Sequence, residues 1–352
     1  MKLISRFGRF APLVLAFLLI LSGCNTNSSA LNPVGKNAKM QADLMLLSLG
    51  IMLLVILAVM VIFFYVIIRF RKRKDDDSIP EQVEGNTKLE IIWTVIPIIL
   101  IIIIAIPTVY QVFVLADDRP SASEIDKENA IRIKVTAHQY WWQFEYPDLG
   151  IQTATDLYVP TGKKVYVELT SKDVIHSFWV PTLFGKQDAN PGLVNRMWFE
   201  VPKEGVYLGQ CAELCGASHA LMDFSVVALS PDKFEAWKKE MKKGADEPKT
   251  AEAKQGRKIF KQQCLRCHAI GKNGGNVGPN LAAYGERTMI SGILEYNKKN
   301  LKNWILNAPK YKADILMPSF SDGSGAKLTE QQADALAEYL MQQKTGIELP
   351  QQ

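Results

Sequence analysis

Residues that bind metals or form covalent cross-links are scarce in this sequence. Its 352 residues include five cysteines and four histidines. Five cysteines are too few for the disulfide framework of a small secreted protein, and each lies in a distinctive local pattern. The net charge is only +5, and the sequence indicates no single dominant basic face, which argues against a nucleic-acid-binding protein.

Charge and hydrophobicity are both segregated along the chain. Hydrophobic residues make up 48% of the sequence and charged residues 22%, which excludes a disordered chain. The long apolar runs lie in residues 1–116, which excludes a wholly cytosolic protein. Residues 117–230 carry fifteen Asp and Glu against ten Lys and Arg, whereas residues 252–352 carry nine against fourteen. The length predicts two or three domains, and two domains of opposite charge would attract each other.

The N-terminus has the parts of a secretory signal peptide. Basic residues at positions 2, 6 and 9 precede an apolar run at 11–21, and Ser22 and Gly23 then precede Cys24. Small residues before a cysteine are similar to the signal of bacterial lipoproteins. We therefore expect residues 1–23 to be a lipoprotein signal peptide and Cys24 to be the lipidated first residue of the mature chain. The alternative is an ordinary signal peptide with an incidental cysteine.

Two long uncharged segments follow the signal peptide. Residues 44–68 and 91–116 contain no charged residue, and at about 1.5 Å per residue each can span a hydrocarbon core of about 30 Å. The second contains Pro97 and Pro107, which a transmembrane helix tolerates when its neighbours satisfy the freed carbonyls. Five basic residues between positions 69 and 74 indicate that the connecting loop is cytoplasmic. Residues 24–119 thus predict a two-helix membrane anchor, with everything after residue 117 outside.

Residues 120–237 have the pattern of an all-β domain. Short segments that alternate apolar and polar residues are separated by turns rich in Gly, Pro, Asn and Asp. Regularly spaced short strands of this kind are typical of a sandwich or a small barrel.

The β domain also contains a cluster of soft metal ligands. Cys211 and Cys215 are followed by His219 and Met222, and His176 lies upstream. Two thiolates, two imidazoles and one thioether suit copper, and the second cysteine would let two copper ions share two bridging thiolates. Two alternatives stay open on these residues alone: a zinc site of two cysteines and two histidines, or a disulfide between the cysteines.

The residues around these ligands resemble subunit II of the haem–copper cytochrome c oxidases. The resemblance covers the membrane anchor and the β domain, and its motifs are CAELCGASHALM, DVIHSFWVP and HQYWWQFEY. It implies a cupredoxin-like barrel with a dinuclear, mixed-valence copper centre called CuA. By position, Cys211 and Cys215 would bridge the two copper ions, and the other ligands would be His176, His219, Met222 and the backbone carbonyl of Glu213. The Glu213 side chain would be a candidate ligand for a magnesium ion shared with subunit I.

The aromatic residues of the last motif have two interpretations. In the family, this region supplies an aromatic residue through which electrons enter from cytochrome c. Many members have tryptophan directly after the His–Gln pair, where this chain has Tyr140, and Trp141 and Trp142 follow. These three residues are candidates for an electron path, and packing of Trp141 and Trp142 in the domain is the alternative.

A second cofactor motif lies beyond a polar segment. Residues 238–251 are polar without apolar periodicity and predict a linker, with a partly helical tail followed by a flexible segment. After the linker, Cys264, Cys267 and His268 form a C-x-x-C-H motif, which is the attachment site of c-type haem. The two cysteines would bond covalently to the haem, and His268 would be one axial ligand of its iron.

The second axial ligand is expected to be a methionine. None of the chain's other histidines lies in residues 252–352, where the candidates are Met289, Met317 and Met341. Met341 falls on the apolar face of a helix expected over 328–343, which Thr329 and Gln332 would open as a capping box. Met317 lies in a loop before a proline and is the predicted ligand.

Residues 252–352 resemble a small, all-α class I cytochrome c over nearly their whole length. The segment Gly278-Pro279-Asn280-Leu281 matches the loop on the histidine side of the haem, which implies that the Pro279 carbonyl orients the His268 imidazole. Several lysines in this domain either form a solvated face or help to dock it onto the acidic β domain: Lys298, Lys299, Lys302, Lys310 and Lys312.

Together these features predict an electron-carrying subunit of a caa-type terminal oxidase in a bacterial cell membrane. Electrons would enter at one haem c, pass to two copper ions, and leave to subunit I, whose haem a and haem–copper site would reduce oxygen to water with proton translocation. The expected partners are subunit I, other oxidase subunits, and a soluble or membrane-bound cytochrome c or a quinol–cytochrome c reductase. Two alternatives are a copper-storage or copper-delivery lipoprotein and a quinol-oxidising relative with a purely structural barrel.

Overall fold

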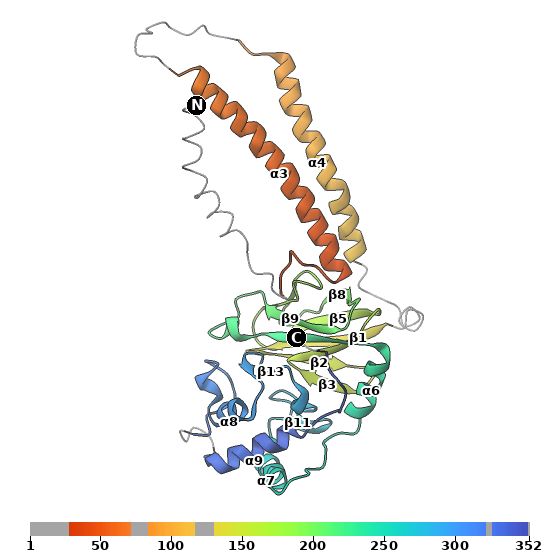
Figure 1. Ribbon diagram of the computed structural model, residues 1–352, viewed down its shortest axis with the longest axis vertical. Coiled ribbons are helices and arrows are strands. Elements are labelled where there is room, and N and C mark those ends of the chain that lie inside the picture. The colour runs from red at the N-terminus through yellow and green to blue at the C-terminus, as the bar shows by residue number, and fades with distance from the viewer. Residues whose placement is uncertain (1–27, 72–83, 117–129, 322–325, 351–352) are drawn as a thin grey trace, which may run out of the picture.

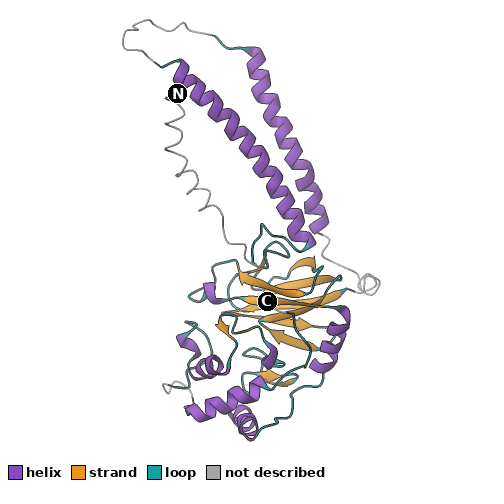
Figure 2. Cartoon of the chain, in the orientation of Figure 1, coloured by secondary structure: helices purple, strands orange, loops and turns teal. Residues whose placement is uncertain are grey.

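The computed structural model describes residues 28–71, 84–116, 130–321 and 326–350 (Figure 1). The predicted signal peptide, Cys24 and part of the basic cluster after residue 69 lie outside these ranges. The described residues form a pair of long helices, a β domain and a smaller, mainly helical domain, as the sequence predicted. The long helices extend from one end of the β domain, and the helical domain lies at its other end (Figure 2).

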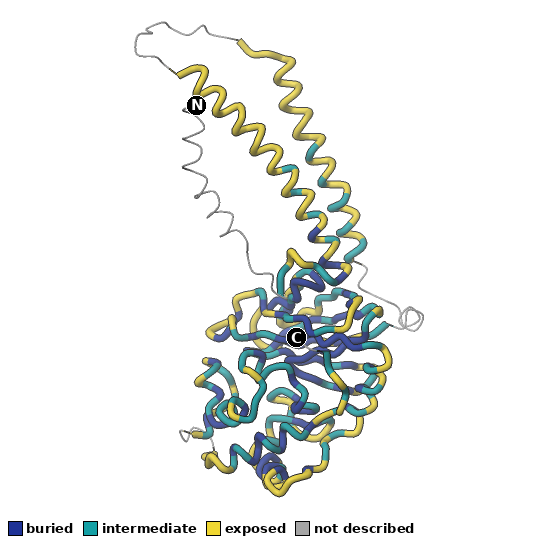
Figure 3. Tube along the Cα trace, viewed as in Figure 1, coloured by how far each residue is buried: buried dark blue, intermediate teal, exposed yellow. Residues whose placement is uncertain are grey.

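The two long helices are α3 (Lys36–Arg69) and α4 (Thr87–Leu115). They contain the predicted uncharged segments, except that α4 ends one residue short of position 116. Both are long and apolar enough to cross a membrane, and their side chains are exposed along most of their length (Figure 3). Asn86 begins α4, because its side chain accepts hydrogen bonds from the backbone N–H groups of Lys88 and Leu89. Such apolar surfaces are suited to lipid or to other transmembrane helices.

The β domain is a sandwich of two five-stranded sheets with orders β3-β2-β1-β5-β8 and β4-β10-β9-β6-β7. The strands are β1 (Ile131–His138), β2 (Trp141–Tyr146), β3 (Ile151–Ala154), β4 (Asp156–Pro160), β5 (Lys164–Ser171), β6 (His176–Trp179), β7 (Gln187–Ala189), β8 (Asn195–Glu200), β9 (Gly205–Cys211) and β10 (Phe224–Leu229). Inward-facing aromatic side chains fill the space between the sheets, and Phe178 stacks on Phe224 with ring centroids 4.5 Å apart.

The start of α3 is fixed to the β domain. The backbone N–H of Gly35 donates to the carbonyl oxygen of Thr182 at 2.9 Å, and the buried side chain of Asn37 donates to the carbonyl oxygen of Trp198 at 2.9 Å. The anchor and the β domain therefore meet through buried hydrogen bonds, which hold the domain close to the end of the helix.

The C-terminal domain surrounds its own apolar core. Its longer elements are α7 (Ala251–Ile259), a π-helical turn η2 (Phe260–Cys264), α8 (Lys298–Leu306) and α9 (Glu330–Met341). Between them lie the short elements β11 (Ala269–Ile270), β12 (Asn273–Gly274), η3 (Tyr284–Glu286), β13 (Met289–Ile290), β14 (Leu294–Glu295) and η4 (Ala308–Lys310). The predicted capping box of Thr329 and Gln332 is present at the start of α9. Helices α7 and α9 cross closely at Gly256, where a Cβ atom would lie 1.9 Å from the Ala335 carbonyl oxygen.

The polar segment between the two domains begins as a helix and then contacts the C-terminal domain. Helix α6 (Pro231–Met241) covers the β domain, where Trp237 stacks on Tyr158. After it, the backbone N–H of Asp246 donates to Gln343 at 2.9 Å, and the Asp246 carboxylate accepts from the backbone N–H of Lys344 at 3.0 Å. The segment expected to act as a linker is therefore hydrogen-bonded, at Asp246, to the end of the C-terminal domain.

Candidate metal and haem sites

The predicted copper ligands come from two segments that the sheet brings together. His176 begins β6, and Cys211 ends the neighbouring strand β9, where it pairs with Phe178. Cys215 lies in the following loop, His219 begins the short helix η1 (His219–Leu221), and Met222 comes directly after it. The antiparallel pairing of β6 and β9 therefore places His176 beside a loop that lies 35 residues further along the chain.

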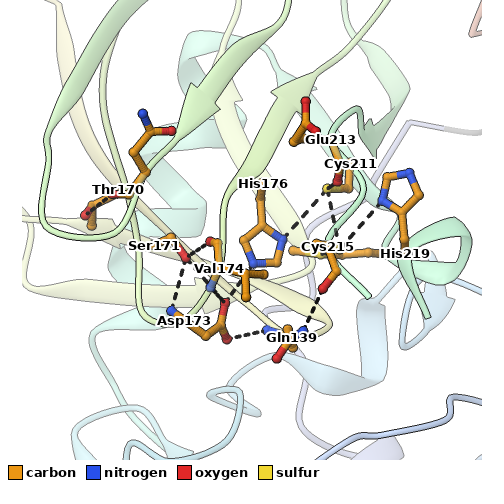
Figure 4. Close-up of polar contacts among 12 residues, drawn as sticks. Gln139, Thr170, Ser171, Asp173, Val174, His176, Cys211, Glu213, Cys215 and His219 are labelled. Carbon is orange, nitrogen blue, oxygen red and sulfur yellow. Dashed lines mark hydrogen bonds and ion pairs between the residues drawn. The ribbon is translucent and has the colours of Figure 1, made fainter. Parts of the chain in front are cut away.

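The donor atoms of these residues form one compact cluster (Figure 4). Cys211 Sγ lies 3.9 Å from Cys215 Sγ and 3.8 Å from His176 Nδ1. Cys215 Sγ lies 3.6 Å from His219 Nδ1 and 3.9 Å from Met222 Sδ. The carbonyl oxygen of Glu213 lies 3.3 Å from Cys211 Sγ, while the Glu213 side chain is exposed. Each imidazole thus faces a different thiol, and the two thiols lie at the centre of the set.

One imidazole of the cluster, that of His176, has a carboxylate as its partner. His176 is fully buried, and its Nε2 lies 2.8 Å from the Asp173 carboxylate, which leaves Nδ1 facing Cys211. Burial lowers the pKa of His176, although Asp173 opposes this effect. Burial by itself would raise the pKa of Asp173, but hydrogen bonds from His176 and from the backbone N–H groups of Gln139 and Val174 outweigh burial and lower it. A carboxylate in this position holds a metal-binding imidazole in one orientation.

The cluster fits a metal that binds thiolates. Burial and the neighbouring Cys211 raise the pKa of Cys215 to about 12, so without a cation its thiol stays protonated at neutral pH. Both cysteines are free, and their sulfur atoms are 3.9 Å apart, so the alternative of a disulfide is not the arrangement present. Two central thiols flanked by two imidazoles and a thioether suit two copper ions with bridging thiolates.

The C-x-x-C-H motif lies at the end of η2. Cys264 and Cys267 are partly buried, and burial raises the pKa of Cys264 to about 12, with Cys267 adding to the effect. His268 Nδ1 lies 2.8 Å from the carbonyl oxygen of Pro279, as the resemblance implied, which leaves Nε2 free to bind iron. Burial lowers the pKa of His268, which favours the neutral imidazole that a metal needs.

A cavity of about 330 Å³ opens beside this motif, and its lining is mostly apolar. Cys264, Cys267, His268 and Met317 all line it. Of the three candidate methionines, only Met317 is among the lining residues: Met289 lies in β13, and Met341 packs on the core of the C-terminal domain. Two cysteines, an imidazole and a thioether around one apolar cavity fit a covalently bound haem.

The β domain contributes part of the cavity wall. Gln139, Tyr140, Trp141 and Thr155 line it together with residues of the C-terminal domain. Trp142, by contrast, is fully buried between the sheets, and its indole N–H donates to the Met222 carbonyl at 3.3 Å. Of the predicted aromatic candidates, Tyr140 and Trp141 therefore face the haem cavity, and Trp142 packs against the copper loop.

Sequence reasoning missed Gln139 and Asp173 as parts of the site. The Gln139 side chain donates to the Cys215 carbonyl oxygen at 2.6 Å, and its backbone N–H donates to the Asp173 carboxylate at 2.7 Å. Both residues lie within motifs that the sequence presented, HQYWWQFEY and DVIHSFWVP. Neither residue type is a usual copper ligand, so only their contacts identify their role.

The two domains are joined by buried polar contacts. The buried carboxylate of Asp156 accepts hydrogen bonds from the backbone N–H and the hydroxyl of Thr288 at 3.2 and 2.9 Å. Lys312 is buried at the interface, whereas Lys298 and Lys302 form ion pairs with carboxylates of their own domain. Of the five lysines considered for docking, Lys312 thus takes part in the interface, whereas Lys298 and Lys302 form ion pairs within the C-terminal domain.

Taken together, the described residues define a membrane-anchored protein with a cupredoxin-like domain and a cytochrome c domain. Comparison with known families agrees. Residues 28–110 match the family described as cytochrome C oxidase subunit II, transmembrane domain, residues 150–229 match its periplasmic domain, and residues 253–344 match cytochrome c.

Individual relatives extend this agreement to the whole chain. Cytochrome c oxidase subunit 2 of Alkalihalophilus pseudofirmus is 45% identical over 344 residues, which cover 97% of this chain and 98% of that protein. The protein of the same name from Bacillus sp. strain PS3 is 48% identical and covers 97% of each chain. Quinol oxidase subunit 2 of Bacillus cereus is 36% identical over 72% of this chain and 86% of its own length.

The chain therefore belongs to the cytochrome c oxidase subunit II family, in the caa-type architecture with a fused C-terminal cytochrome c domain. It is a subunit of an oxidase complex and a partner of subunit I, with its two folded domains outside the membrane. This membership does not fit the alternative of a copper-storage or copper-delivery lipoprotein.

Proposed function

We propose that this chain carries single electrons from a haem c to a dinuclear CuA centre and on to subunit I, where oxygen is reduced to water with proton translocation. When bound, the haem and the copper ions supply the one-electron redox chemistry. The observation that carries the proposal is the common wall between the two sites: Gln139 lines the haem cavity and also donates a hydrogen bond to Cys215.

Separate sets of residues would hold the copper ions and the haem. Cys211 and Cys215 would bridge two copper ions, and the other copper ligands would be His176, His219, Met222 and the carbonyl of Glu213. Cys264 and Cys267 would hold one haem c covalently, with His268 and Met317 on its iron. Four of the copper ligands, His176, Cys211, Cys215 and Met222, are buried, which keeps water away from them and limits the rearrangement that accompanies a change of charge.

The exposed side chain of Glu213 supports a further assignment. Its backbone carbonyl faces Cys211, while its carboxylate points away from the cluster and is free to reach a partner. We assign this carboxylate as a ligand of a magnesium ion shared with subunit I. Oxygen ligands of this kind suit magnesium.

The remaining proposals concern the membrane and the electron donor. Residues 1–23 would be removed as a lipoprotein signal, and Cys24 would carry the lipid that adds a third attachment to the two helices. The donor would be a soluble or membrane-bound cytochrome c or a quinol–cytochrome c reductase. Mass spectrometry of the N-terminal peptide tests the lipid at Cys24 directly, because an unmodified cysteine would contradict it.

The copper content of the chain tests the central proposal. In the purified full-length chain with haem attached, we expect two copper ions per chain and one unpaired electron shared between them in the EPR spectrum. A quinol-oxidising relative with a structural barrel would bind no copper. One zinc ion per chain would also contradict the proposal, because Zn²⁺ has no redox chemistry and cannot transfer electrons.

A further inference from the structure

The loop that carries Met317 is held by the copper domain as well as by its own domain. The carbonyl oxygen of Ala313 accepts a hydrogen bond from the Ser218 hydroxyl at 2.8 Å. Ser218 is buried and lies next to His219, in the loop of copper ligands. Two residues further along, Ile315 packs against the core of the β domain. The methionine loop, residues 311–317, is therefore hydrogen-bonded to the copper loop, residues 211–222, and packs against the β domain.

Lys312 adds a second connection between the same two regions. Only 2% of its surface is exposed, and its ammonium group donates to the carbonyl oxygens of Ser291 at 2.7 Å and Tyr140 at 3.1 Å. Ser291 belongs to the C-terminal domain, whereas Tyr140 lies in the β domain beside the copper loop. The nearby Asp223 carboxylate faces it with the opposite charge.

A buried lysine needs such partners to be tolerated. Removing an ammonium group from water is costly unless hydrogen bonds replace those to solvent. Lys312 donates its replacement hydrogen bonds to backbone carbonyl oxygens of both domains, so the cost of burial is offset in full only when the two domains are docked. Lys312 also lines the haem cavity, but its ammonium group is bonded to the two carbonyl oxygens that join the domains, and it has no part in the steps proposed for the copper or the haem.

We propose that Ser218 and Lys312 form a latch that fixes the methionine loop to the copper domain and so keeps Met317 on the haem iron. A thioether is a neutral and weak ligand, so its occupancy depends on how firmly its loop is held. The latch makes the haem ligation depend on docking of the two domains. This inference rests on the proposed function, because it takes Met317 as the axial ligand.

Imidazole titration of the ferric haem in the full-length chain tests the latch. Imidazole displaces methionine from the iron, and the loss of the methionine-to-iron absorption band reports the opening of the loop. Lys312→Leu removes both hydrogen bonds that this charged group donates without adding a thioether to the cavity, and we expect imidazole to bind at least about tenfold more tightly. Ser218→Ala removes one neutral hydrogen bond that joins the two domains, and we expect an increase of about threefold.

Two further variants make the result decisive. Lys310→Leu changes an exposed lysine two residues away, and we expect wild-type imidazole affinity. Because Ser218→Ala is a mild change in the other domain, it keeps the test valid even if Lys312→Leu does not fold. Unchanged imidazole affinity in Ser218→Ala, with the methionine band present, would overturn the latch. If Met317→Ala leaves the methionine-to-iron band unchanged, the assignment of Met317 as the axial ligand is wrong.

Discussion

The side-chain amide of Gln139 donates a hydrogen bond to the backbone carbonyl oxygen of Cys215, 2.6 Å away. Gln139 also lines the haem cavity, while Cys215 is one of the two central thiols of the copper cluster. One side chain therefore connects the wall of one site to a ligand of the other. Its backbone N–H is bonded to Asp173, which holds His176, so both copper-binding segments meet at this residue.

The first prediction concerns this contact. Gln139→Leu keeps the approximate size of the side chain but removes the hydrogen bond, so this connection between the cavity wall and Cys215 becomes a weaker contact through space. We expect electron transfer from haem to copper to slow severalfold after photochemical reduction of the haem, with unchanged haem and copper spectra. Gln152→Leu is the matched control, because Gln152 accepts a hydrogen bond from Asn280 across the same interface but does not line the cavity. Equal rates in both variants would count against the path.

A second prediction follows from the protonation of Cys215. Because its pKa is raised to about 12, the thiol must lose its proton when a metal binds. Copper binding to the copper-free chain should release protons, and the apparent affinity should fall as the pH falls, by about tenfold per pH unit for each proton displaced. A pH-indicator dye measures the release. Cys215→Ser should release fewer protons and bind less than two copper ions, and an unchanged release would falsify the bridging role.

A third prediction separates the candidate methionines. Met317→Ala should leave the haem attached, because Cys264 and Cys267 form the covalent bonds, but should remove the methionine-to-iron band and lower the reduction potential of the haem. Redox titration with absorption spectroscopy measures both effects. Met289→Leu and Met341→Leu should leave both unchanged, since neither residue lines the cavity. If either control loses the methionine-to-iron band, that methionine, and not Met317, is the axial ligand.

A fourth prediction concerns the close approach at Gly216. Its φ of +136° is a conformation that side chains rarely adopt, and a Cβ atom there would lie 2.4 Å from Tyr140 Oη and 2.9 Å from Gln139 Nε2. Gly216→Ala should therefore displace the copper loop, with a cost of about 1–3 kcal/mol from backbone strain before the clash is counted. Thermal unfolding measures the loss of stability, and a copper titration measures the effect of the loop displacement on copper affinity.

Gly162→Ala is the matched control for this strain. Gly162 also has a positive φ of +68°, but no atom lies within 4 Å of the position that its Cβ would take. This variant should lower the melting temperature slightly and leave copper affinity unchanged. If Gly216→Ala behaves no differently, the close packing of the two loops does not control the copper site.

Local motifs made much of the architecture predictable from the sequence. Runs of uncharged residues identified α3 and α4, and alternation of apolar and polar residues between turns indicated a β domain, because each of these patterns depends only on neighbouring residues. The capping box at Thr329 was predicted for the same reason. Contacts between distant segments were not predictable: the interface role of Gln139 and the hydrogen bonds of the segment around Asp246 depend on domains that pack against each other.

The sequence by itself determined which chemistry this protein carries, since cysteine pairs at fixed spacing with adjacent histidines are local and chemically distinctive. Tertiary structure decided how those groups meet. The pairing of β6 with β9 brought His176 to the two thiols, and the folding of one loop placed Met317, rather than Met289 or Met341, in the cavity. Docking of the two domains then gave the haem cavity a wall made partly of copper-domain residues. These outcomes depend on buried contacts across long sequence separations, which no short segment of the chain specifies.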